Sequence, residues 1–187
     1  MRKILVTGGA GFIGSNFVRM VLEEHEDCSV VNFDKLTYAG NLENIAEYME
    51  HPRHKFVKGD ICDDERVARV IDENKIDAII NFAAESHVDR SIVEPKVFID
   101  TNVSGTLTLL KIALNRGLER FLQISTDEVY GSLGAEGQFH ETTPLSPNSP
   151  YSASKAAADH LVHAADRTAD QRDGVGRAGR HRREGLW

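Results

Sequence analysis

A tyrosine and a lysine stand four residues apart in the segment YSASK, where Tyr151 and Lys155 would lie on one face of a helix. A phenol with a pKa of about 10 is a poor base at neutral pH, but a nearby ammonium group stabilises the phenolate and lowers that pKa. Beside a hydride acceptor, Tyr151 could therefore remove a proton from an alcohol while hydride leaves the same carbon. Without such an acceptor, the same spacing is usually only a surface pair.

Two carboxylic acids, Asp127 and Glu128, stand side by side in the segment ISTDEVYG. They follow Thr126, which ends an apolar segment typical of a buried strand and could hold a substrate hydroxyl. Like charges on neighbouring residues repel, and a strand end gains no packing from them. We therefore expect the acid pair to serve a function rather than the fold.

A glycine-rich segment, VTGGAGFIGSN, connects the first apolar run to the first expected helix. Three of its glycines recur with two residues between them, Gly8, Gly11 and Gly14, and a G-x-G-x-x-G pattern starts one residue later. Glycines here permit a tight turn and a close approach of the backbone to a pyrophosphate. The N–H groups at the helix start, those of Phe12 and Ile13 among them, would then bind the phosphates.

An acidic residue, Asp34, ends the second apolar run, 20 residues after Gly14. A carboxylate at this distance accepts hydrogen bonds from the ribose 2′-hydroxyl of a bound dinucleotide and repels a 2′-phosphate. This favours NAD over NADP, although the neighbouring Lys35 weakens the discrimination. Taken without the glycines, Asp34 would be read as an acid that caps a loop.

The ends of the third and fourth expected strands complete the predicted cofactor site. In open parallel sheets, ligands bind at the carboxyl ends of the strands. Asp60 and Ile61 end the third strand, where an adenine would lie, and the small side chains of Ala83 and Ala84 end the fourth. These four residues are placed by the expected topology rather than by a motif.

Apolar runs and amphipathic segments alternate along residues 1–166, which predicts βαβ units and a Rossmann-type, doubly wound parallel sheet of α/β class. The expected strands are 3–7, 29–33, 55–59, 77–83 and 120–126. The expected helices are 12–24, 42–49, 64–74, 95–116 and 151–165. This fold would bring the glycine loop, Asp34 and the acid pair to one edge of the sheet.

Composition narrows the class of protein. The chain has 187 residues and a net charge of −7, which argues against general nucleic-acid binding. It contains no run of 18 or more apolar residues, so we expect no membrane span. Cys28 and Cys62 form no CxxC pattern; we expect buried thiols in a reducing, cytoplasmic compartment rather than a disulfide. No Cys/His spacing indicates a metal site.

The motifs together resemble a known family. TGGAGFIG, Asp34 and YSASK are similar to the extended short-chain dehydrogenase/reductases. With FDKLTYAGN, AAESHVDRSI, ISTDEVYG and SPYSASKAAADH, residues 1 to about 168 resemble the dTDP-glucose 4,6-dehydratases. The acid pair carries the narrower likeness, because many sugar-nucleotide epimerases have small neutral residues there.

The resemblance implies a lyase that uses bound NAD, in the synthesis of deoxysugar nucleotides of the rhamnose type. Glucose C4 is oxidised, water is eliminated across C5–C6, and the hydride returns to C6. Tyr151 is then the base at the C4 hydroxyl, and Lys155 tunes it and binds the nicotinamide ribose. Glu128 takes the C5 proton, and Asp127 protonates the departing C6 hydroxyl. Two adjacent carboxyls can separate their pKa values as these roles require.

The resemblance also implies further contacts. Ser86, in the loop after the fourth strand, would touch the substrate. Lys35 and Thr37 would lie beside the adenosine ribose, and Thr101 would reach the cofactor region. Family members are commonly homodimers that pair through two long helices, here 95–116 and 151–165.

The likeness ends near residue 168. The segment 167–187 carries six Arg, is rich in Gly and shows no strand, so we expect a disordered tail after an NAD-binding domain that ends at 166. The C-terminal lobe with which the family grips the sugar nucleotide has no counterpart here, so we expect a truncated chain with weak NAD binding and little turnover. Two alternatives stay open: another sugar-nucleotide dehydratase or epimerase, and a non-catalytic NAD-binding remnant.

Overall fold

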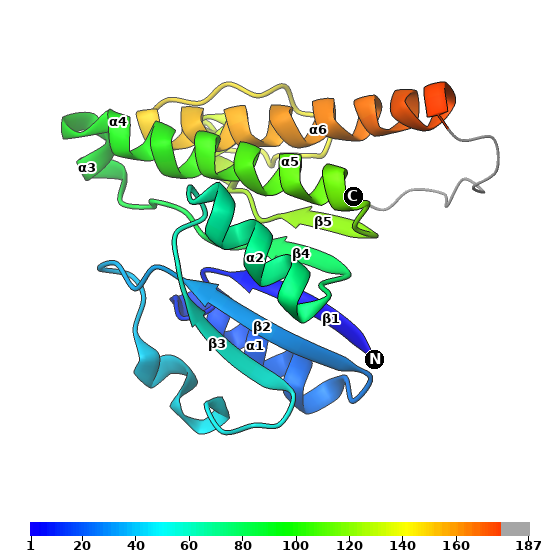
Figure 1. Ribbon diagram of the computed structural model, residues 1–187. Helices are drawn as coiled ribbons and strands as arrows, with labels where there is room; N and C mark the ends of the chain where they lie inside the picture. The colour runs from blue at the N-terminus through cyan, green and yellow to red at the C-terminus, as the bar shows by residue number, and fades with distance from the viewer. Residues whose placement is uncertain (177–187) are drawn as a thin grey trace.

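The computed structural model describes residues 1–176 and contains a five-stranded sheet in which neighbouring strands are parallel (Figure 1). The strand order is β3-β2-β1-β4-β5. The strands are β1 (Arg2–Thr7), β2 (Cys28–Asp34), β3 (His54–Lys58), β4 (Ala78–Asn81) and β5 (Arg120–Gln123). Because the order reverses at β1 and the crossovers are helical, the Rossmann-type fold predicted from the sequence is confirmed.

The strand register brings several loops to one edge. Thr7, the last residue of β1, pairs with Phe33 of β2 and with Asn81 of β4. The three strands therefore end level with one another, and the loops that follow them emerge together. This is the position at which open parallel sheets bind ligands.

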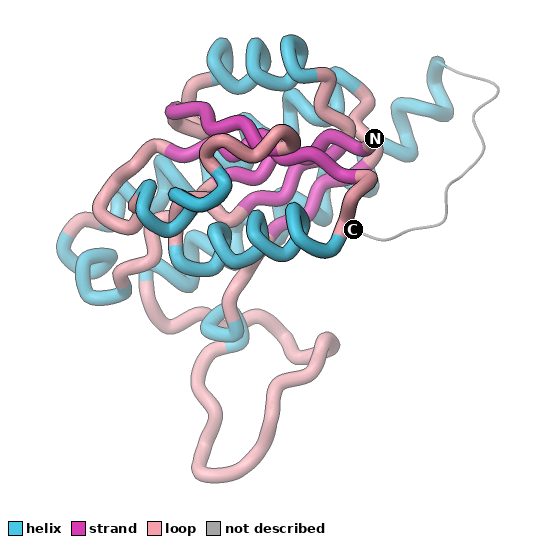
Figure 2. Tube along the Cα trace, turned by 90° about the horizontal axis from the view of Figure 1, so that it is seen from below, coloured by secondary structure: helices cyan, strands magenta, loops and turns pink. Residues whose placement is uncertain are grey.

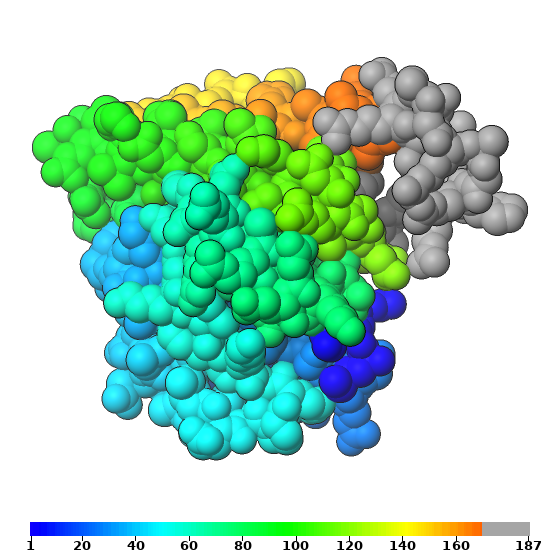
Figure 3. Space-filling model, in the orientation of Figure 1, coloured from blue at the N-terminus to red at the C-terminus, as the bar shows by residue number. Residues whose placement is uncertain are grey.

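Helices cover both faces of the sheet. Helix α1 (Phe12–Glu24) lies on one face, and α2 (Asp64–Asn74), α5 (Thr106–Arg116) and α6 (Pro150–Gly176) lie on the other (Figure 1). The alternation along β1 explains this: Ile4 and Val6 pack with α1, while Leu5 packs with α2 and α5. Viewed from the face that carries α2 and α5, these two helices form the middle and upper part of the surface, in front of the strands (Figure 3).

The helix expected over 95–116 consists of three joined segments, α4 (Pro95–Phe98), the π-helical η2 (Ile99–Gly105) and α5. Gly105 packs so closely that a Cβ there would lie 2.5 Å from the Ile61 side chain. The stretch is long and apolar enough to span a membrane by composition alone. Its side chains Phe98, Leu109 and Ile112 are buried, so we assign it to the core of the domain.

The boundary of α6 corrects a prediction. The helix was expected to end near residue 165 but continues to Gly176, because no proline or glycine interrupts the chain before Gly174. The expected tail, 167–187, therefore begins inside a helix, and its part 177–187 lies outside the described residues.

Three short helical segments complete the chain. The 3₁₀ helix η1 (Leu42–Tyr48) was predicted as an ordinary helix, whereas α3 (Val88–Val93) and the 3₁₀ helix η3 (Asp127–Tyr130) were not predicted. The last two follow β4 and β5 directly. Beyond η3, a long loop of residues 131–149 projects away from the body of the molecule (Figure 2).

Candidate active site

The glycine loop turns tightly between β1 and α1, and two of its glycines leave no room for a side chain. Gly8 has a φ of +69°, and a Cβ there would lie 2.6 Å from the backbone nitrogen of Ala83. A Cβ on Gly14 would lie 2.3 Å from the carbonyl oxygen of Gly8. Glycine is therefore required here for close backbone contact and, at Gly8, for a left-handed conformation.

The start of α1 is open to a ligand. Gly11 is the N-cap residue and supplies no side-chain hydrogen bond, and the next two residues, Phe12 and Ile13, are exposed. The first N–H groups of a helix have no partner inside the helix, and they carry partial positive charge. This end of α1 therefore fits an anionic group such as a phosphate.

Asp34 is buried and ties two loops together. Its Oδ2 accepts a hydrogen bond from the Ala10 N–H at 3.0 Å, and its Oδ1 accepts one from the Leu36 N–H at 2.8 Å. The sequence did not predict the first of these bonds, which joins the carboxylate to the glycine loop. Each carboxylate oxygen has a second lone pair, so the predicted bond to a ribose hydroxyl stays compatible with this geometry.

The predicted adenine region lies where the loops after β2 and β3 meet. Lys35 Nζ pairs with Asp60 Oδ2 at 2.7 Å, and Ile61 is buried. Burial would raise the pKa of Asp60, but the Lys35 ammonium and the Cys62 N–H outweigh it and lower that pKa. Cys62 is exposed as a whole, but partial burial of its sulfur, which contacts the Asp100 carbonyl, and the Asp60 carboxylate raise the pKa of the Cys62 thiol to about 11. Both cysteines are free, although Cys62 is exposed rather than buried as expected.

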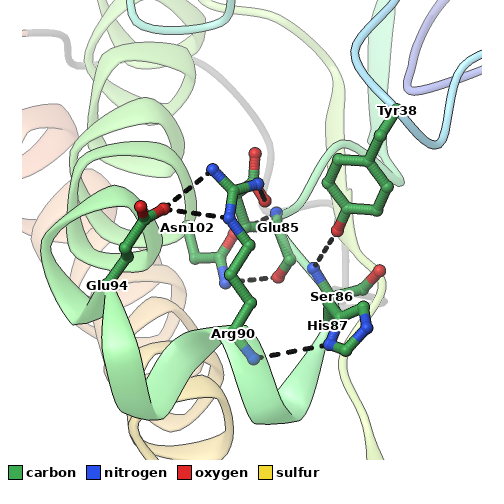
Figure 4. Close-up of polar contacts among 7 residues, drawn as sticks. All are labelled: Tyr38, Glu85, Ser86, His87, Arg90, Glu94 and Asn102. Atoms are coloured by element: carbon green, nitrogen blue, oxygen red, sulfur yellow. Dashed lines mark hydrogen bonds and ion pairs between the residues drawn. The ribbon is translucent and has the colours of Figure 1, made fainter.

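The loop after β4 is held by a buried amide. Asn102, in η2, accepts a hydrogen bond from the Glu85 N–H at 2.8 Å and donates to the Glu85 carbonyl at 3.0 Å (Figure 4). It also donates to Ser154 Oγ in α6 at 2.8 Å. One side chain therefore connects the β4 loop to two helices. These partners lie 17 and 52 residues away, so no local pattern could have revealed them.

An arginine and a tyrosine close the same network. Arg90 pairs with Glu85 at 3.3 Å and with Glu94 at 3.0 Å, and its guanidinium lies 5.8 Å from the centre of the Tyr38 ring. The Tyr38 hydroxyl accepts a hydrogen bond from the Ser86 N–H at 3.3 Å (Figure 4). Tyr38 belongs to the loop after β2, so this contact joins the β2 and β4 loops.

The acid pair forms the first turn of η3. The Thr126 hydroxyl caps this helix by accepting from the Glu128 N–H at 3.3 Å. The Asp127 carboxylate is exposed, and its one described hydrogen bond is to the same hydroxyl at 3.4 Å. Because Thr126 caps a helical turn here, the chain leaves the direction of β5 at Asp127 and Glu128. Both carboxylates keep oxygen lone pairs that could accept further hydrogen bonds.

Tyr151 lies close to this turn. Burial raises the pKa of its phenol, the Thr126 hydroxyl lowers it, and the carboxylates of Glu128 and Asp127 raise it further. The predicted lowering of this pKa by Lys155 stays a prediction, and the net shift is upward. The cause is that half-burial and two nearby negative charges outweigh any favourable interaction. The same charges show that the acid pair and the phenol share one site.

Lys155 is buried, with 4% of its surface exposed, and its ammonium donates to the Ile124 carbonyl at the end of β5. Burial lowers the pKa of this lysine, and the carboxylate of Asp159 raises it in part. The ammonium therefore faces the strand end from inside the protein. Tyr151 and Lys155 do lie on one side of α6, as the spacing predicted.

The remaining predicted residues lie around this edge, and those with described contacts make them through the backbone: the Ala83 N–H donates to the Thr7 hydroxyl at 3.4 Å, and the Ser86 N–H donates to Tyr38. Ala83 and Ala84 are half-buried at the β4 end, as is Thr101 in η2, whereas Thr37 and Ser86 are exposed. Their roles stay predictions. In the part of the chain that the structure describes, no group of three or more His, Cys, Asp or Glu side chains could hold a metal.

Comparison with known proteins adds a family assignment. A family model described as GDP-mannose 4,6 dehydratase matches residues 5–181. The chain is 57% identical over 167 residues to a low-salt glycan biosynthesis protein of Haloferax volcanii, covering 89% of this chain and 53% of the relative. It is 56% identical over 173 residues to a dTDP-glucose 4,6-dehydratase of Xanthomonas campestris, covering 88% and 49%.

The fold has solved counterparts. A crystal structure of a dTDP-glucose 4,6-dehydratase from Streptomyces venezuelae, with NAD bound, matches with a TM-score of 0.85 and 50% identity. The match covers 90% of this chain and 52% of that one. The chain thus spans about half the length of the relatives it matches.

Proposed function

The chain belongs to the GDP-mannose 4,6-dehydratase family, and from that premise we propose that it carries the cofactor-binding and reacting residues of an NAD-dependent dTDP-glucose 4,6-dehydratase. The observation that carries the proposal is the meeting of Tyr151, Thr126, Asp127 and Glu128 at the β5 end. The choice of a dehydratase over an epimerase depends on the carboxylates of Asp127 and Glu128, neither of which is paired with a cation in the described part of the chain.

The cofactor fits the residues present. The side-chain-free turn at Gly8 and Gly14 and the uncapped start of α1 would receive the pyrophosphate, and Asp34 the adenosine ribose. NAD, when bound, accepts a hydride from the sugar and later returns it. Lys155 would donate to the nicotinamide ribose. Tyr38 and Ser86 would lie beside the bound cofactor, where they join the β2 and β4 loops.

The side chains then divide the proton transfers. Thr126 holds the C4 hydroxyl, and Tyr151 takes its proton as C4 is oxidised to a ketone. The ketone acidifies the C5 proton, which Glu128 removes. Asp127 gives a proton to the C6 hydroxyl, which leaves as water. The hydride then adds to C6, and Glu128 returns its proton to C5. C4 is oxidised and C6 is reduced, so the net change is the loss of one water.

A titration with NAD followed by incubation with dTDP-glucose tests this. We expect weak NAD binding by calorimetry and, at low turnover, a product that mass spectrometry shows to be lighter by one water. Binding without any product would support the non-catalytic remnant. Product that differs only in C4 configuration, with no loss of water, would support an epimerase. Absence of NAD binding would refute both the dehydratase and the remnant.

The family resemblance leads to three wider proposals for the whole protein: deoxysugar-nucleotide synthesis, a cytoplasmic location and a homodimer. The dimer is supported by a groove between α5 and α6, whose lining includes Leu107, Leu110, Leu114 and Leu161. Leu107 is 51% exposed, so its apolar side chain is accessible at this groove. Sedimentation of the wild-type chain and of Leu107→Glu tests the dimer, which the charge should dissociate.

A further inference from the structure

Three side chains of α6, one helical turn apart, contact three consecutive residues that follow β5. Tyr151 lies beside the Thr126 hydroxyl, and Lys155 donates to the Ile124 carbonyl. Ser125 lies between Ile124 and Thr126, and its hydroxyl donates to the carboxylate of Asp159. The first two contacts belong to the proposed active site. The third, from Ser125 to Asp159, has no role in it so far.

The buried ammonium of Lys155 needs a counter-charge. Only 4% of the residue is exposed, and one carbonyl accepts from its three N–H groups among the described contacts. An ammonium in such a place loses its hydration and tends to give up its proton. The ion pairs of the described chain do not include Lys155, and the negative group one turn away is Asp159.

We propose that Asp159 is a positioning residue that keeps Lys155 in its charged form and, through Ser125, fixes the segment that carries the reacting carboxylates. The Asp159 carboxylate attracts the Lys155 ammonium electrostatically, and the Ser125 hydroxyl holds the carboxylate in place through a hydrogen bond. The consequence for cofactor binding rests on the proposed function, because it assigns Lys155 to the ribose. The electrostatic part does not.

The surroundings of Asp159 suit this task. Burial raises the pKa of its carboxyl, while the Ser125 hydroxyl, Lys155, His160 and His163 lower it. The three cationic or titratable neighbours come from α6 itself, and the segment after β5 contributes only the hydroxyl. In the reverse direction, Asp159 is the group that raises the pKa of Lys155 against burial.

Nuclear magnetic resonance of ¹³C-labelled lysine side chains measures the charge of Lys155 directly, without cofactor or turnover. The Lys155 signal is identified as the one missing from Lys155→Arg. We expect its titration midpoint to move to lower pH in Asp159→Asn and to stay near the wild-type position in Asp159→Glu. Ser125→Ala, which keeps the charge but loses the hydroxyl, should produce a smaller shift in the same direction.

Two outcomes overturn the proposal: an unchanged midpoint in folded Asp159→Asn, or a shift in Ser125→Ala as large as in Asp159→Asn. If Asp159→Asn does not fold, a shift in Asp159→Glu equal to or larger than that of Ser125→Ala overturns it as well. Circular dichroism confirms that each variant is folded.

A second readout connects the charge to the cofactor. In Asp159→Asn we expect NAD affinity to fall about tenfold between pH 7 and pH 9, the size of a single lost charge contact, and the wild-type affinity to fall less. A pH profile identical to the wild type would contradict the cofactor part of the proposal. A wild-type chain that binds no NAD would instead refute the proposed function, and the lysine titration would still decide the role of Asp159.

Discussion

The loops after β4 and β5 lie at the same edge of the sheet but are held in opposite ways. In the β4 loop, the backbone of Glu85 and its carboxylate are bonded by Asn102 and Arg90, and Ser86 is bonded by Tyr38. In the β5 segment, Asp127 has one long contact and is exposed. The protein therefore fixes the loop on the proposed cofactor side and leaves its two acids with few protein partners.

This difference agrees with what the proposed function requires of each side. A loop that borders a bound cofactor gains from rigidity, because every ordered contact lowers the entropy lost on binding. A carboxylate that must give or take a proton loses that ability when it is already paired with a cation. The contacts that Asp127 and Glu128 lack are those that substrate hydroxyls and carbon-bound protons would supply.

The difference between the two loops is tested most sharply at Glu128. We expect Glu128→Gln to reduce turnover by about 10²- to 10⁴-fold, because the C5 proton loses its base. Stability to urea should stay within about 0.5 kcal/mol of the wild type, since no described side-chain contact is lost. A stability loss comparable to that of a core substitution would show that this carboxylate serves the fold.

The same variant has a readout that does not need turnover. The Glu128 carboxylate raises the pKa of Tyr151, so its removal should lower that pKa. Ultraviolet difference titration against Tyr151→Phe measures the phenol alone. An upward shift, or none, would mean that the two groups do not share a site.

On the cofactor side, the largest effect is expected for Gly8→Ala. The new Cβ would meet the backbone of Ala83 at 2.6 Å, at a φ of +69°. Strain and overpacking together should cost about 2–5 kcal/mol and abolish NAD binding. Gly134→Ala is the matched control, because a Cβ there meets nothing within 4 Å; equal losses in the two variants would show that the glycine loop is not special.

A smaller loss is expected for Asn102→Ala. The buried amide bonds both backbone groups of Glu85, and its removal leaves them without partners. Unfolding in urea should show a loss of about 1–3 kcal/mol. The exposed Asn115→Ala serves as control and should be neutral. If Asn102→Ala were equally neutral, the β4 loop would not depend on this connection.

The smallest effect is expected for Tyr38→Phe. The phenyl ring keeps its place over Arg90, and only the bond from the Ser86 N–H is lost. Stability should change by about 0.5 kcal/mol or less, while NAD dissociation measured by stopped flow becomes faster. Tyr38→Ala removes the ring as well and should accelerate dissociation further; no difference between the two would leave the ring without a role.

The parts of the structure that were predicted from the sequence are those with local causes. Strands and most helices follow from apolar periodicity, and the glycine turn and the Tyr151–Lys155 face follow from spacing within a few residues. The features that were not predicted have non-local causes. The π-helical segment packs against Ile61, 44 residues from Gly105, and the raised pKa of Tyr151 depends on burial and on charges 23 and 24 residues away in sequence. The bond between Ser125 and Asp159 spans 34 residues and leaves no mark in either segment alone.

The two backbone bonds of Asp34 have a consequence for anyone who wishes to redesign the chain toward NADP. Exchanging the acid for a neutral residue would remove the repulsion of a 2′-phosphate, but it would also free the Ala10 and Leu36 amides. The Asp34 side chain would therefore set both the preference for NAD over NADP and the shape of the glycine loop. An asparagine has one acceptor oxygen and could keep only one of the two bonds to these amides. A successful exchange would therefore also need a change in the neighbouring turn that supplies the second acceptor, so that the glycine loop keeps its shape.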